Sequence, residues 1–211
     1  MFKAYDIRGI AGEELTPQFA CRLGKSIVAH LNARCIAVAR DIRESGPDLH
    51  DSFIEGVIVS GCDVMDLGIT TTGVLYRASK DLDVDVSVMI TASHNPPEYN
   101  GFKICKGTLP MAGEELQELR ETMERGDFIE GTGKLIDAQE FQRQYIETVT
   151  RNVGKPGRKI RVAIDCGNAV PGPLAITVLE RIGVDVVPVH CTWDNKFPNH
   201  PPDPTRKENM V

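Results

Sequence analysis

Apolar positions along this chain change repeatedly between the spacing of helices and the spacing of strands. After Thr16-Pro17, a capping hydroxyl followed by a proline suited to the first helical turn, apolar residues recur every four positions at Phe19, Leu23, Ile27 and Leu31. Similar patterns predict further helices, which begin at Pro47 or cover 72–80, 114–124, 138–151 and 173–182. Short apolar runs predict strands at 35–39, 62–67, 84–90, 102–105, 161–165 and 184–189.

The alternation of these strands and helices predicts an α/β fold with a mixed, mainly parallel sheet flanked by helices. The glycine-rich stretch 126–137 is predicted to be a connection, and 152–158 a linker. Beyond the linker, a strand-helix-strand unit restarts the rhythm, which predicts the start of a second, similar α/β domain. The predicted boundaries are 1–137 for the first domain, 138–158 for a helix and linker, and 159–211 for an incomplete second domain.

Composition and charge narrow the class of protein. The chain has 211 residues and 41% hydrophobic content, enough for a sizeable core, and no apolar run approaches the ~20 residues that span a bilayer. Without a signal-peptide pattern, a cytoplasmic protein is expected. Its six cysteines lack any Cys-x-x-Cys pair, which favours reduced thiols over a zinc site or disulfide framework. The net charge of −6 argues against a general nucleic-acid surface.

Residues 91–103 carry the most chemical information in the chain: Thr-Ala-Ser-His-Asn-Pro-Pro-Glu-Tyr-Asn-Gly-Phe-Lys. They follow the predicted strand at 84–90, and the two prolines and the Asn-Gly pair predict a tight loop that holds Ser93 on a stiff, exposed turn. His94 and Lys103 offer proton-donating or positive groups, which suit phosphate better than an acyl group. A Ser-His pair alone is also typical of an ordinary turn. The Gly-x-Ser-x-Gly elbow of a serine hydrolase is absent.

Taken whole, this loop resembles the active-site loop of the α-D-phosphohexomutases, the phosphomannomutase/phosphoglucomutase family. Further stretches similar to family motifs extend over the chain, at 2–9, 39–46, 162–168 and 197–204. The family also has an Asp-Gly-Asp-x-Asp-Arg loop that holds Mg2+, a third domain that selects the sugar and a fourth that grips the substrate phosphate. None of these is matched, so the chain is expected to be the N-terminal part of a longer enzyme, its partners being the missing C-terminal domains.

The resemblance implies that Ser93 is a phosphoserine. Its phosphate would pass to the free hydroxyl of a hexose monophosphate, and the other phosphate of the bisphosphorylated intermediate would return to Ser93, so that hexose 1-phosphate and 6-phosphate interconvert. The implied cofactors are Mg2+, bound here only through the Ser93 phosphate, and a hexose 1,6-bisphosphate activator. Lys103 would be an electrostatic or proton-handling partner, and His94 would shape the loop.

Other residues match family positions that border the active-site cleft. Tyr5 and Arg8 would contact substrate, with the arginine fork suited to phosphate; from the residues alone, an ion pair of Arg8 with Asp6 or Asp41 is equally open. Five residues are predicted to brace the loop without touching substrate: Arg40, Asp41, Arg43, Asn95 and Asn100. Ser45 is predicted to cap the helix that begins at Pro47.

Two other interpretations concern function and metal binding. A noncatalytic phosphoprotein or phosphosugar-binding module would keep this loop without the rest of the enzyme, and the 211 residues alone are expected to be inactive in either case. Asp81, Asp83 and Asp85 mimic a carboxylate metal cluster, but alternate positions on an incoming strand predict a solvent-facing row instead.

Overall fold

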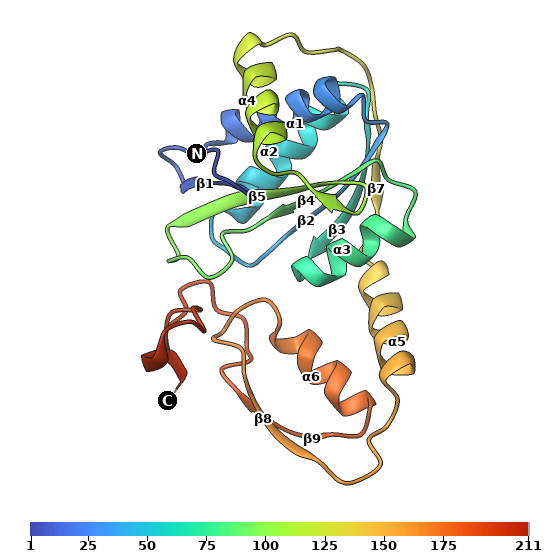
Figure 1. Ribbon diagram of the computed structural model, residues 1–211, viewed down its shortest axis with the longest axis vertical. Helices are drawn as coiled ribbons and strands as arrows, with labels where there is room; N and C mark the ends of the chain where they lie inside the picture. The colour runs from blue at the N-terminus through green and yellow to red at the C-terminus, as the bar shows by residue number, and fades with distance from the viewer. Residues whose placement is uncertain (211) are drawn as a thin grey trace.

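A computed structural model describes residues 1–210, which form two α/β units joined by one helix (Figure 1). The first unit is built on a 7-stranded sheet in the order β1-β5-β4-β2-β3-β7, with β6 paired to β5. Strands β2, β3, β4 and β7 run parallel, whereas β1, β5 and β6 pair antiparallel. Their bounds are β1 Ile7–Ile10, β2 Cys35–Arg40, β3 Asp63–Ile69, β4 Val86–Ile90, β5 Tyr99–Lys106, β6 Leu109–Pro110 and β7 Leu135–Asp137. The mixed, mainly parallel sheet is as predicted.

Helices cover both faces of this sheet (Figure 1). One face packs against α1 (Pro17–Leu31), α2 (Gly46–Ile58) and α4 (Glu114–Arg125), and the other against α3 (Thr72–Asp81). The backbones of α1 and α2 meet where glycines allow it: a Cβ on Gly56 would lie 2.1 Å from the carbonyl oxygen of Cys21. The predicted cap of α1 is present, since Thr16 Oγ1 accepts a hydrogen bond from the Phe19 amide at 3.2 Å.

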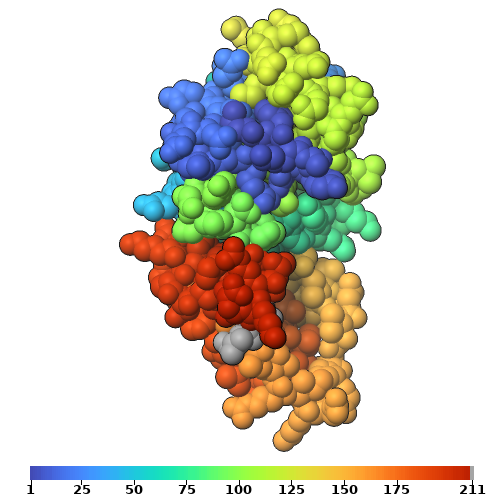
Figure 2. All heavy atoms as spheres, turned by 60° about the vertical axis from the view of Figure 1, so that its left-hand side comes forward, coloured from blue at the N-terminus to red at the C-terminus, as the bar shows by residue number. Residues whose placement is uncertain are grey.

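The second unit begins after α5 (Phe141–Val153) and contains β8 (Arg161–Asp165), α6 (Gly172–Arg181) and β9 (Asp185–Val189). Its two strands pair in parallel, and α6 is the crossover helix that connects them. After β9 the chain turns back toward the first unit and ends in a short 3-10 helix, Lys207–Met210. In Figure 2 this C-terminal stretch (red) lies against the green residues that follow β4.

Several predicted bounds need correction. The connection at 126–137 ends in β7, which pairs with the edge of β3; its three residues are too few to show a strand period. Strand β4 begins at Val86 rather than at residue 84, and all five of its residues are buried because helices cover both faces. Helix α5 begins at Phe141 rather than 138, and the short strands β1 and β6 were not predicted.

The three aspartates before β4 do not form the predicted solvent-facing row on a strand. Asp81 belongs to the end of α3, and Asp85 accepts hydrogen bonds from the backbone amides of Arg34 and Cys35 at 2.7 and 3.3 Å. Asp85 therefore ties the start of β4 to the start of β2.

Candidate active site

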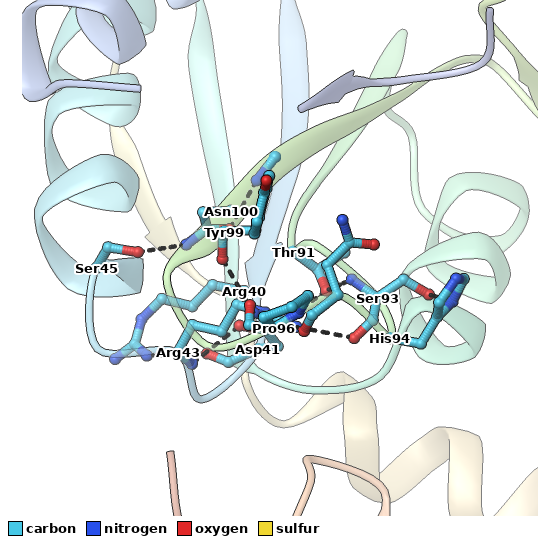
Figure 3. Close-up of polar contacts among 12 residues, drawn as sticks. Arg40, Asp41, Arg43, Ser45, Thr91, Ser93, His94, Pro96, Tyr99 and Asn100 are labelled. Atoms are coloured by element: carbon cyan, nitrogen blue, oxygen red, sulfur yellow. Dashed lines mark hydrogen bonds and ion pairs between the residues drawn. The ribbon is translucent and has the colours of Figure 1, made fainter. Parts of the chain in front are cut away.

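Ser93 lies on an exposed turn just beyond the end of β4, as predicted (Figure 3). Its φ of 59° is in the left-handed region, which is uncommon for a residue other than glycine. The Ser93 amide donates to Thr91 Oγ1 at 2.9 Å, and Ser93 Oγ lies 3.3 Å from Nδ1 of His94, which is also exposed. The turn thus presents the hydroxyl to solvent while the backbone beneath it is fixed.

The side chain of Arg43, only 1% exposed, is hydrogen-bonded to the backbone of this turn. Arg43 Nη1 donates to the carbonyl oxygens of Pro96 and Tyr99 at 2.6 and 3.0 Å. Arg43 Nη2 donates to those of Ser93 and Asn95 at 3.0 and 2.7 Å. One buried guanidinium therefore satisfies four backbone carbonyls of the loop, and fixes its conformation (Figure 3).

Asp41 connects this guanidinium to Ser93 by a second route. Its carboxylate accepts from Arg43 Nε at 3.2 Å, from the Arg43 amide at 3.0 Å and from Thr91 Oγ1 at 2.5 Å. Burial lowers the pKa of Arg43 and the charge of Asp41 partly offsets this, so the guanidinium remains charged at neutral pH. No role was predicted for Thr91. The available signal was its position, as a polar residue directly after an apolar strand.

Other residues predicted to brace the loop lie beside this network. Arg40 Nη1 donates to the backbone oxygen of Asp41 at 3.1 Å and makes no ion pair with its carboxylate. Asn100, fully buried, donates from Nδ2 to Ser45 Oγ at 2.9 Å. The predicted cap by Ser45 is wrong: its backbone is helical (φ −77°, ψ −6°) rather than extended, and its side chain makes no capping bond.

A charged cluster lies on the other side of the loop. Asp6 pairs with Arg8 Nη2 at 2.5 Å and lies 3.5 Å from Lys103 Nζ, so it is the shared partner of two cations. Arg8 Nη1 donates to Asn95 Oδ1 at 2.7 Å, which links the cluster to the Ser93 turn. Within residues 1–210, Arg8 Nε is buried without a hydrogen-bond partner. Tyr5, which precedes Asp6 in the sequence, is 76% exposed.

This arrangement suits an anion more than an acyl substrate. Two cations share a single carboxylate, so the cluster retains one net positive charge, and Arg8 has more N–H donors than its two side-chain hydrogen bonds use. A Mg2+ site is a different matter: among the described residues, no three His, Cys, Asp or Glu side chains lie together as metal ligands. The side chains present do not by themselves fit Mg2+. Nor does any helix within 1–210 have the length and apolar character needed to cross a membrane.

Comparison with known proteins places this geometry in a family. Residues 1–130 match phosphoglucomutase/phosphomannomutase, alpha/beta/alpha domain I, and residues 143–211 match alpha/beta/alpha domain II of the same family. The chain belongs to the phosphoglucomutase/phosphomannomutase family. The first match covers the first α/β unit up to residue 130, and the second covers most of α5 together with the second unit.

Family members with similar sequences cover the whole chain. Phosphomannomutase/phosphoglucomutase of Pseudomonas aeruginosa is 40% identical over 213 residues, covering 100% of this chain and 46% of that protein. Phosphoglucomutase of Neisseria gonorrhoeae is 39% identical, with the same coverage of both. The chain therefore spans about half the length of the curated relatives it matches.

Solved structures of the family agree with the fold. A phosphoglucomutase/phosphomannomutase family protein from Burkholderia thailandensis superposes with a TM-score of 0.94 at 34% identity, covering 99% of this chain and 48% of that one. A putative phosphomannomutase from Thermus thermophilus gives a TM-score of 0.84 at 21% identity, covering 100% and 50%, and supports the fold alone.

Proposed function

We propose that this chain is the phosphoryl-carrying part of a hexose phosphate mutase, with Ser93 Oγ as the atom that bears the transferred phosphate. The observation that carries the proposal is the exposed Ser93 residue on a left-handed turn, in a loop four of whose backbone carbonyls accept hydrogen bonds from the buried Arg43. Membership of the phosphoglucomutase/phosphomannomutase family supports the reaction class.

In the proposed reaction, the bond between phosphorus and Ser93 Oγ breaks as a new bond forms to the free hydroxyl of a hexose monophosphate. That hydroxyl loses its proton to a base of the site, and the hexose becomes bisphosphorylated. After the intermediate turns over, its other phosphate returns to Ser93 Oγ and the proton is given back to the sugar oxygen. The net result is an isomerised hexose monophosphate and a regenerated phosphoserine.

The charged cluster would supply part of the electrostatic stabilisation. A phosphate on Ser93 adds a charge of about −1.5 to −2. Arg8 and Lys103 provide two positive charges, of which Asp6 neutralises one. The remaining positive charge would attract the phosphorylated sugar to the side of the Ser93 loop on which this cluster lies. Lys103, with an ammonium rather than a guanidinium, is the proposed proton carrier, and His94, beside Ser93 Oγ, is the alternative.

Two cofactors belong to the proposal. Mg2+ would supply positive charge to the transferring phosphoryl group, and from this chain only the Ser93 phosphate is proposed to contact it. A hexose 1,6-bisphosphate would place the first phosphate on Ser93. We further propose a cytoplasmic location, which suits the six free cysteines.

A second candidate, a noncatalytic phosphosugar-binding module, is favoured by the absence of a three-ligand metal group among residues 1–210. We propose that the 211 residues alone bind Mg2+ only weakly and do not turn over. Calorimetry of the isolated chain with Mg2+ tests this. Micromolar binding would contradict it and would require a carboxylate site in this part of the enzyme.

The decisive variant for the mutase is Ser93→Ala in the full-length parent enzyme. We expect turnover of hexose 1-phosphate to 6-phosphate to be lost while the circular dichroism spectrum and melting temperature stay unchanged. Ser52→Ala, a serine within α2, is the matched control and should keep full activity. Undiminished activity of Ser93→Ala would refute the phosphoserine mechanism.

A further inference from the structure

We propose that Phe197, in the second unit, is a positioning residue for the Ser93 turn of the first unit and acts through Arg43. The consequence for rate rests on the proposed function, whereas the effect on the turn itself does not. The proposal joins two residues from different family domains.

The guanidinium of Arg43 leaves only its flat faces free. Its five N–H donors all have acceptors in the plane of the group: the Asp41 carboxylate through Nε, and four loop carbonyls through Nη1 and Nη2. The Phe197 ring lies 5.6 Å from Arg43 Cζ, in cation–π geometry. An aromatic ring on a face excludes water from the hydrogen bonds at its edge without competing for the donors.

Phe197 is held in place by the second unit. The ring is 8% exposed, and the residue has a φ of 49°, a costly conformation for an aromatic side chain. Its amide donates to the carbonyl oxygen of Asp194 at 3.1 Å, and nearby Asn199 Nδ2 donates to Asn168 Oδ1 at 2.7 Å. Hydrogen bonds therefore fix the segment that carries the ring to the turn that follows β8.

This arrangement makes the order of the Ser93 turn depend on where the second unit lies. Figure 2 shows the C-terminal residues lying against the part of the first unit that follows β4. If the second unit moves away, Arg43 loses the ring, water reaches its bonds to the loop carbonyls, and the Ser93 turn loosens. With the two units together, the serine oxygen is held in one orientation.

Amide hydrogen exchange tests this directly in the protein as it stands. In Phe197→Leu, which keeps an apolar side chain but removes the π face, we expect the Ser93 amide to exchange about tenfold faster than in the wild type. Phe197→Tyr should restore the wild-type rate within about twofold. The Cys166 amide, bonded to the carbonyl oxygen of Val189, should be unchanged in both variants.

Trp193→Leu is the matched control, because it removes an aromatic ring from the same segment at a 40% exposed position. It should leave the Ser93 amide unaffected. Equal exchange of that amide in the wild type and Phe197→Leu would overturn the proposal. So would an equal rise at Ser93 and Cys166, since that would indicate a general loss of structure.

A double-mutant comparison separates action through Arg43 from independent packing. In an Arg43→Gln background, Phe197→Leu should change Ser93 exchange by less than about twofold. A full tenfold effect in that background would refute the route through Arg43. In the full-length enzyme, Phe197→Leu should lower kcat with KM unchanged, and Phe197→Tyr should rescue it. If Ser93 never carries phosphate, the proposed function fails while the exchange results still decide this inference.

Discussion

Thr91 Oγ1 donates a hydrogen bond to Asp41 Oδ2 at 2.5 Å and accepts one from the Ser93 amide at 2.9 Å. Because a hydroxyl has one hydrogen, the carboxylate fixes its direction and turns its lone pairs toward the Ser93 amide. The buried charge of Asp41 is thereby connected to the backbone of the residue that we propose to carry phosphate.

Replacing Thr91 with valine removes this hydroxyl at almost constant volume. The Ser93 amide and the buried Asp41 carboxylate each lose a partner, so we expect the free energy of unfolding to fall by about 1–3 kcal/mol. Urea denaturation of the 211-residue chain measures this. Thr91→Ser keeps the hydroxyl and should lose far less. Equal stability of the valine and serine variants would show that the hydroxyl bonds contribute nothing net.

A pH-dependent contribution to stability is expected from His50 in α2. Its ring nitrogens lie 3.0 Å from carboxylate oxygens of Asp51 and Asp66. Burial lowers the pKa of His50, but the two carboxylates outweigh burial and the net pKa is raised above 6.5. Burial raises the pKa of Asp66, while the bond to His50 and its charge reverse this and the net pKa falls below 3.8.

The directions of the two pKa shifts define the pH range in which this pair stabilises the fold. The raised pKa of His50 contributes stability that is fully present below 6.5 and is lost as the pH rises through the folded value. The lowered pKa of Asp66 contributes stability above 3.8 that is lost as the pH falls through its folded value. Asp66→Asn should therefore destabilise the chain more at about pH 5 than at about pH 9.

Asp51→Asn is the control for that measurement, because the Asp51 side chain is 81% exposed and water screens its charge. Urea unfolding at both pH values should show a smaller pH-dependent loss for this variant. An Asp66→Asn loss that is the same at both pH values would contradict a charged His50 in the folded state.

Substitutions of Lys103 in the full-length enzyme distinguish a fixed positive charge from a proton carrier. Lys103→Arg keeps the positive charge beside Asp6 but cannot release a proton at working pH, so we expect kcat to fall about 10²-fold or more. Lys106→Met, an exposed position at the end of β5, is the control and should keep normal kcat. If Lys103→Arg is nearly normal while Lys103→Met is inactive, Lys103 is a fixed charge and His94 becomes the candidate base.

The fold could be predicted wherever a pattern repeated for several residues. The start of helix α1 was predicted to the residue because Thr16, the proline after it and four-residue apolar spacing agree. Strand β7 was missed because its three residues include a 57% exposed Leu135 at a sheet edge, where neither period nor burial leaves a signal. The start of β4 was misplaced because both faces of that strand are buried, so alternation carries no information.

The sequence could predict which residues form the site, but not the hydrogen bonds and contacts between them. Prolines and the Asn-Gly pair predict a stiff turn around Ser93, and the motif draws attention to Arg43. The four carbonyl acceptors of Arg43 are backbone atoms, which leave no trace in residue type. Phe197 could not be connected to Arg43 because the two belong to different units that meet only in the folded chain.

Following the phosphate through one turnover tests directly whether Ser93 carries it. The full-length enzyme is incubated with hexose 1,6-bisphosphate labelled in its phosphates, freed of excess reagent, mixed with unlabelled hexose 6-phosphate and quenched at short times. We predict that the label first lies on Ser93 alone, passes to the sugar at a rate at least equal to kcat, and never appears in Ser93→Ala. Label on another residue, or transfer slower than turnover, would show that Ser93 is not the phosphate carrier.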